Sequence, residues 1–84
     1  MNLEELRTTA AQSAQQLRDQ GASLTSASQG IGDQGRVVLG VLGSHRSANP
    51  TGAAISGSVT ALSEAASHCE QAASAIDAWV GSNF

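Results

Sequence analysis

The sequence predicts an all-α protein: an antiparallel helical hairpin with a glycine-broken first helix, which completes a bundle by association. Three observations predict this fold. Apolar residues recur at intervals of seven along two long segments, a stretch of turn-forming residues separates these segments, and Ala, Ser and Gln fill most other positions. A chain of 84 residues has room for one domain, so we expect residues 1–84 to form a single helical unit.

The first helix is expected over residues 2–29. Asn2 is a favourable N-cap, and Glu5 follows three residues later, as in a capping box. Repeats of seven are typical of a helix that packs along another helix, as in a coiled coil. The first row of the repeat is Leu3, Ala10, Leu17, Leu24, Ile31 and Val38. A second, only partly apolar row is expected at Leu6, Ser13, Gln20, Ala27, Gln34 and Val41.

Three glycines interrupt the first helical pattern. Gly30, Gly32 and Gly35 each cost a helix roughly 1 kcal/mol relative to Ala. Because they fall so close together, we expect a weak joint at residues 30–34, followed by a short helix at about residues 35–43. One unbroken helix is the alternative, because the heptad repeat continues past the glycines.

A loop is expected over residues 43–52, followed by a second helix at about residues 51–80. Gly43 can close the preceding helix, since glycine readily adopts the positive φ of a C-terminal cap. Asn49 and Pro50 suit the N-cap and first position of the second helix.

The second helix has the more regular apolar pattern. Gly81, which follows the last apolar residue, is expected to cap its C-terminus. Two rows at intervals of seven alternate in steps of four and three, which predicts a seam packed against another helix. The rows are Ile55, Leu62, Cys69 and Ile76, and Val59, Ala66, Ala73 and Val80.

The apolar residues are small, which predicts a thin core. Fifteen residues are Ala, and Leu, Ile, Val and Phe together number only sixteen. An Ala-rich seam removes little area from water, so it contributes less than a Leu-rich seam at about 25 cal/mol per Å². We therefore expect another helical protein, or a second copy of the chain, to complete the bundle.

The larger seam residues are the candidate partner interface. Trp79 flanks the second seam, either as a plug at the open end of the hairpin or as an interface anchor, a role in which Trp is enriched. The full candidate set is Leu3, Leu6, Leu17, Leu24, Ile31, Val38, Ile55, Val59, Leu62, Ile76, Trp79 and Val80.

Composition argues against several other classes of partner. The four arginines are scattered and outnumbered by seven acids, whereas nucleic acids and anionic membranes require clustered positive charge. No apolar run approaches the 18 residues that a membrane span needs, so no membrane insertion is expected. The acidic start Met1–Leu6 lacks the features of a cleavable signal peptide.

No residue pattern supports an enzyme, a metal or a cofactor. His68, Cys69 and Glu70 are adjacent on a helix, so they point in different directions and cannot all face one ion. His45 and Asp77 accompany many serines, but no nucleophile elbow is present. The glycines at 30–35 do not follow a strand, which a nucleotide-binding loop requires. We expect no catalytic residue and no small-molecule substrate.

The overall plan resembles the small helical-hairpin substrates of bacterial type VII secretion, the WxG and proline-glutamate families. The similarity lies in the Ala-, Ser- and Gln-rich helices, in Gln29-Gly30-Ile31-Gly32, and in the turn at Pro50-Thr51-Gly52. The similarity to small actinobacterial helical proteins is fainter, and it rests on their turn, which resembles Gly43-Ser44 through Pro50 here. The resemblance implies a four-helix bundle with a partner, and synthesis in the cytoplasm followed by export without a cleavable signal peptide.

The chain departs from these families at their defining motifs. Trp79-Val80-Gly81 is a Trp-x-Gly, but it ends the second helix instead of forming the turn. The chain has no Tyr, which the families' export signal needs, and no Pro-Glu near its start. If the chain belongs to them, a partner must supply the signal. Two functions remain open: one half of a type VII-like pair, as co-substrate or chaperone, or a structural protein that self-associates into a homo-oligomer.

Overall fold

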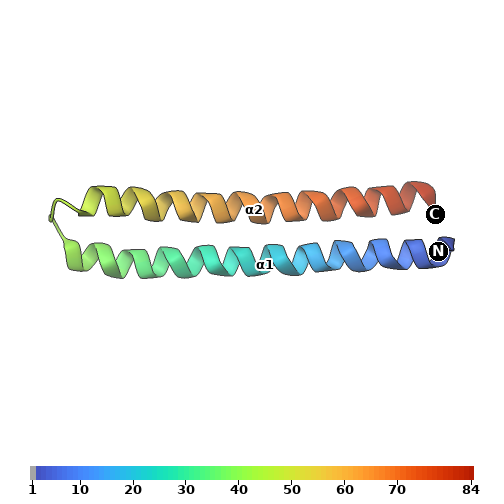
Figure 1. Ribbon diagram of the computed structural model, residues 1–84, viewed down its shortest axis with the longest axis horizontal. Helices are drawn as coiled ribbons and strands as arrows, with labels where there is room; N and C mark the ends of the chain where they lie inside the picture. The colour runs from blue at the N-terminus through green and yellow to red at the C-terminus, as the bar shows by residue number, and fades with distance from the viewer. Residues whose placement is uncertain (1) are drawn as a thin grey trace.

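The computed structural model describes residues 2–84 as two helices, α1 (Leu3–Leu42) and α2 (Ala48–Asn83). The helices run antiparallel side by side, so both ends of the chain lie at the same end of the rod (Figure 1). The rod measures 62 × 16 × 15 Å. The predicted all-α helical hairpin is therefore confirmed.

The expected break in the first helix is absent, because α1 continues through residues 30–34. Close packing explains only one of the three glycines, Gly35. A Cβ on Gly32 would make an ordinary contact with Val59 at 4.0 Å, but one on Gly35 would lie 2.6 Å from Ile55 Cγ2. Glycine thus lets α2 approach here, and the contact offsets the helix-propensity cost of roughly 1 kcal/mol per glycine. Nothing in the structure requires glycine at position 30, where a Cβ would meet open space.

The N-terminus of α1 begins as predicted. Asn2 is the N-cap, and its side-chain Oδ1 accepts a hydrogen bond of 2.8 Å from the backbone N–H of Glu5. Glu4 and Glu5 lie in the first turn, where negative charge is favourable at the positive end of the helix dipole.

The turn is shorter than predicted. Gly43 ends α1 with a φ of 56° and donates its N–H to the Leu39 carbonyl, as expected of a C-terminal glycine cap. However, α2 begins at Ala48, so Ser47 and not Asn49 is its N-cap. Pro50 is the third residue of the helix, where its missing N–H removes no intrahelical hydrogen bond.

The C-terminal end of α2 also lies further along the chain than predicted. Gly81 is inside the last turn instead of capping it, and the helix runs to Asn83. The N–H of Phe84 donates to the Val80 carbonyl, and the Asn83 side chain donates to the Trp79 carbonyl at 2.8 Å. These bonds continue the helix past the glycine.

The predicted seam is confirmed for α2 and only in part for α1. All eight predicted seam positions of α2 are half-buried or buried, and so are Ala10, Leu17, Leu24 and Ile31 of the first α1 row. The second α1 row was wrong. Gln20, Ala27, Gln34 and Val41 are exposed, and the buried positions come four residues after the first row instead of three. These are Ala14, Gly21, Ser28 and Gly35.

The core is as thin as the composition predicts. Among residues 2–84, the only buried apolar side chains are Ala14 and Ala73, and no large side chain is fully buried. Seven large apolar side chains are exposed instead: Leu3, Leu6, Val37, Val38, Val41, Trp79 and Phe84.

Candidate interaction surface

A row of polar contacts joins the two helices along one face of the hairpin. Arg18 of α1 reaches across to α2, where its Nη2 lies 2.6 Å from Asp77 Oδ2 and its Nε lies 3.4 Å from Glu70 Oε1. The hydrogen bond with Asp77 raises the pKa of the Arg18 guanidinium above its usual value. Because the bridge joins residues 59 positions apart, it helps to fix the register of the helices.

Removal of Arg18 tests this bridge. All three groups remain partly exposed to solvent, so the pairs are screened and their contribution to stability is modest. We expect Arg18→Ala to lower the midpoint of thermal unfolding slightly at low salt, and the difference to vanish near 1 M salt, where the Debye length is about 3 Å. Arg36→Ala is the control, since Arg36 pairs only with Asp33 on its own helix. Equal midpoints for both variants at low salt would contradict a role in joining the helices.

A second polar contact lies at the middle of the seam. Ser28 is only 6% exposed, and its Oγ donates to the Val59 carbonyl at 3.3 Å and lies 3.2 Å from Ser63 Oγ. The buried Ser28 hydroxyl therefore has its hydrogen-bond partners. These polar contacts add no buried apolar area, so they do not compensate for the small apolar area of the seam.

A shallow groove of about 330 Å³ lies between the helices near the turn. Its α1 side includes Gly32, Gly35 and Leu39, and its α2 side includes Gly52 and Ile55. Glycine backbone forms part of the groove wall at these three positions, and Ile55 fills the place of a side chain at Gly35. Arg36, Ser56 and Thr60 border the groove, which opens on the same face as the Arg18 bridge, as the heptad positions require.

The candidate interface residues divide into two groups. Eight are half-buried in the seam of the hairpin itself: Leu17, Leu24, Ile31, Ile55, Val59, Leu62, Ile76 and Val80. Four remain exposed: Leu3, Leu6, Val38 and Trp79. The first group therefore holds α1 against α2, and the role of all twelve in binding a partner stays a prediction.

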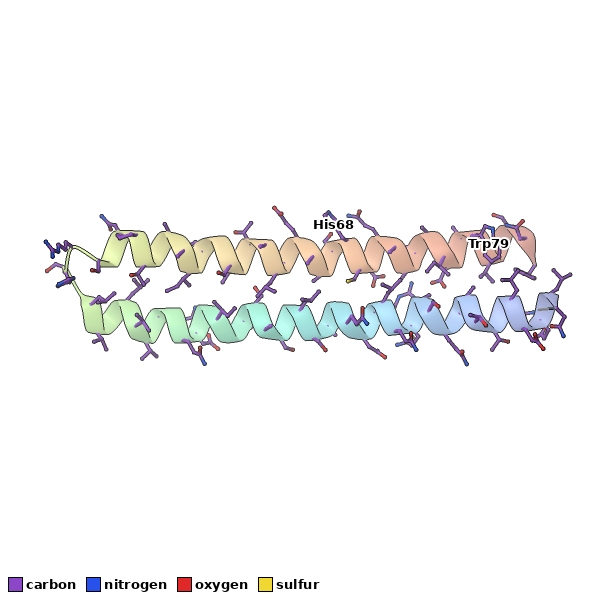
Figure 2. The ribbon with its side chains drawn as sticks, viewed as in Figure 1. His68 and Trp79 are labelled. Carbon is purple, nitrogen blue, oxygen red and sulfur yellow. The ribbon has the colours of Figure 1, made fainter. Side chains whose placement is uncertain are left out.

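Trp79 lies near the open end of α2 and is 43% exposed (Figure 2). Its ring contacts Phe84 edge to face, with 5.5 Å between the ring centroids. Such pairs are worth about 0.5–1.5 kcal/mol beyond the area that they bury. The pair forms a half-exposed aromatic cluster at the open end of the hairpin.

The residues considered for chemistry are dispersed in the structure. His68 is exposed and projects away from α1 (Figure 2), whereas Cys69 is half-buried in the seam, with its Cβ facing Gly21. His45 accepts a hydrogen bond of 3.1 Å from the Ser47 N–H and so stabilises the turn. Within residues 2–84, no three metal-binding side chains come together, and neither helix is apolar enough over its length to cross a membrane.

Sequence reasoning missed the row of small residues that lines α1. Ala14, Gly21, Ser28 and Gly35 recur at intervals of seven, and this signal was visible in the sequence. Large apolar residues are the stronger signal, and Leu6 and Val41 favour a second row on the wrong side of the helix. A small residue at every seventh position indicates close approach of two backbones, as a Cβ on Gly21 would already lie 3.4 Å from the Ala66 carbonyl oxygen.

Comparison with known proteins places the chain in no family. No protein-family model matches it, and neither a curated protein nor a solved structure shows significant similarity to it.

Proposed function

We propose that this chain is a non-enzymatic interaction module that packs its helices against another helical protein. One observation carries the proposal: along a hairpin 62 Å long, the only buried apolar side chains of residues 2–84 are two alanines, while seven large apolar side chains stay exposed. A two-helix protein with so small a core is marginally stable, and apolar side chains left exposed are stabilised when a partner covers them.

The process that we propose for this module is type VII-like secretion, as co-substrate or as chaperone-like half of a pair. The hairpin architecture and the Ala-, Ser- and Gln-rich helices support this proposal. According to this proposal, the chain is made in the cytoplasm and is exported together with a partner that carries the export signal. The alternative is a structural protein that assembles with copies of itself, which the same exposed apolar side chains favour.

Light scattering and circular dichroism of the purified chain test the proposal and separate its two forms. A chain that is poorly ordered alone but gains helix with the product of a neighbouring gene supports the paired form. A stable homo-oligomer supports the self-assembling form. A well-folded, monodisperse monomer with a mass of 8.4 kDa and cooperative unfolding would contradict both.

Trp79 provides a spectroscopic test of the same proposal. Since the indole is half-exposed in the single hairpin, we expect its fluorescence to shift to the blue and become protected from quenchers on assembly. Trp79→Ala should weaken the assembly, and the variant should lose helix content in parallel as it dissociates. If the emission stays red and freely quenched in the assembled protein, Trp79 is not an anchor of the interface.

A further inference from the structure

One face of the hairpin carries no acidic or basic residue other than a single histidine. This charge-free face lies opposite the Arg18 bridge and the groove, which occupy the other flank of the seam. From α1 it contains Leu6, Thr9, Ser13, Gln16, Gln20, Ser23, Ala27, Gly30, Gln34, Val37 and Val41. From α2 it contains Thr51, Ala54, Ser58, Ala61, Ala65, His68, Ala72, Ala75 and Trp79. Both sets alternate in steps of three and four, so each forms a second heptad stripe beside the seam.

The charge-free face holds four of the exposed large apolar side chains. Leu6 is 37% exposed, Val37 69%, Val41 83% and Trp79 43%. A face of the 62 × 16 Å rod covers about 1,000 Å² per copy, so pairing two such faces would bury about 2,000 Å² in total, at the upper end of a standard stable interface. The face is therefore large enough to hold a dimer.

The large and small residues of the face are placed so that the face complements itself when one copy is reversed end to end. Reversal about the middle of α1 (Leu3–Leu42) carries Leu6 to about position 39 of the other copy, between Val37 and Val41. The same reversal carries Trp79 to the first turns of α2, where the face presents the small Thr51 and Ala54. A two-fold interface requires this kind of match between a surface and itself.

The distribution of charge along the rod favours the same orientation. The half with the chain ends contains five acids and two arginines, a net charge of −3, whereas the half with the turn contains two acids and two arginines and is neutral. Two copies aligned in the same direction would bring both −3 halves together. Reversed copies place each −3 half beside a neutral half, which lowers the repulsion.

His68 lies near the mid-length of the charge-free face, toward its outer edge. It is less than one turn from the midpoint of α2 (Ala48–Asn83), and Figure 2 shows it projecting away from α1. In the reversed pair, the α2 helices cross the two-fold axis here, so the two His68 residues are offset along the rod by only about 7.5 Å, less than one and a half helical turns. In a pair aligned in the same direction, each α2 would instead face the other copy's α1, far from the second His68.

We propose that the partner of this chain is a second copy, bound through the charge-free face with its ends reversed, to form a four-helix bundle. This proposal rests on the proposed function and specifies its partner, its surface and its orientation. The two-fold axis passes beside His68, and the Arg18 bridge and the groove remain on the outside of the bundle.

Cysteine cross-linking tests the orientation. His68→Cys is made in a Cys69→Ala background, which keeps the Cβ at the seam and removes the native thiol. A bis-maleimide with a short spacer forms one C–S bond with each of two thiols by addition across its double bonds, with no leaving group. We expect rapid conversion to a covalent dimer, since the two Cα atoms lie about 7.5 Å apart along the rod, too far for a disulfide but within reach of such a spacer. Ser67→Cys in the same background is the control, because this neighbouring, exposed residue lies outside the charge-free face and should cross-link at least tenfold more slowly.

A charged substitution tests the surface independently. Ala72→Glu places two negative charges in the proposed interface, whereas Gln71→Glu places them one position away, on the outward ridge. Both positions are exposed in the single hairpin, so neither change should disturb its folding. Sedimentation equilibrium should show at least a tenfold weaker dimer for Ala72→Glu and an unchanged dimer for Gln71→Glu.

The outcomes separate this inference from the proposed function. A dimer that neither His68→Cys traps nor Ala72→Glu weakens overturns the inference and leaves the interaction module standing. A chain that becomes ordered only with a different protein also overturns the inference and leaves the interaction module standing. A self-sufficient, well-folded monomer overturns both, and a dimer with both expected responses supports both.

Discussion

Leu62→Asp is expected to abolish the ordered hairpin. Leu62 is half-buried at the middle of the α2 seam, where α1 packs closely. The substitution removes apolar contacts and places a carboxylate between the helices, so it should cost about 3 kcal/mol or more. That is a large share of the stability of any small domain, and the seam here is thin. Circular dichroism should show loss of helix, and sizing should show loss of any assembly.

Gln71→Asp is the matched control for Leu62→Asp. Gln71 is exposed and outside both seam rows, and its side chain makes only a long hydrogen bond of 3.3 Å to Ser67 Oγ on the same helix. An exposed change of this kind usually alters stability by less than about 0.5 kcal/mol. If both aspartate variants behave alike, the heptad assignment of α2 is wrong.

Gly35→Leu is expected to separate the helices near the turn. A Cβ alone would come within 2.6 Å of the branched side chain of Ile55, which cannot easily move aside, and a leucine would add three more carbons. We expect a loss of about 2–3 kcal/mol or more, from overpacking and from lost contact along the seam. This loss of stability is measured by thermal unfolding, with circular dichroism as the signal.

Gly30→Ala should have the opposite effect. A Cβ at position 30 meets nothing within 4 Å and the residue is helical, so the substitution should stabilise the protein by about 0.5–1 kcal/mol. Replacing Gly30, Gly32 and Gly35 together by Ala would mix these opposing effects. A destabilised Gly30→Ala variant, or a Gly35→Leu variant with wild-type stability, would contradict the packing described here.

The sequence predicted the class of fold because its strongest signals are local. The heptad rows of α2 and the cap at Asn2 depend on spacing along one helix, and both are present in the structure. The glycines of α1 were misread because the propensity of a residue does not show what packs against it. Gly35 costs the isolated helix stability, yet it is the position at which Ile55 approaches most closely.

The candidate surface was harder to predict than the fold. Most of the large residues chosen for a partner, such as Leu24 and Leu62, are used to hold the hairpin together. The charge-free face is defined by the packing of the helices, which places Arg18, Glu70 and Asp77 on the opposite flank of the seam. The spacing of residues along a helix gives the angular position of each residue. It does not show which stripe of residues packs against the other helix and which stripe stays free for a binding partner, because that depends on how the helices pack.

The central claim is that this hairpin depends on association for its order, and dilution tests it most directly. Helix content and unfolding midpoint are measured by circular dichroism across a hundredfold range of concentration, with the mass followed in parallel by sedimentation. We expect the midpoint to fall as the chain is diluted, and the 8.4 kDa monomer to lose helix as it appears. A monomer that keeps its full helix content and a concentration-independent, cooperative unfolding transition would contradict it.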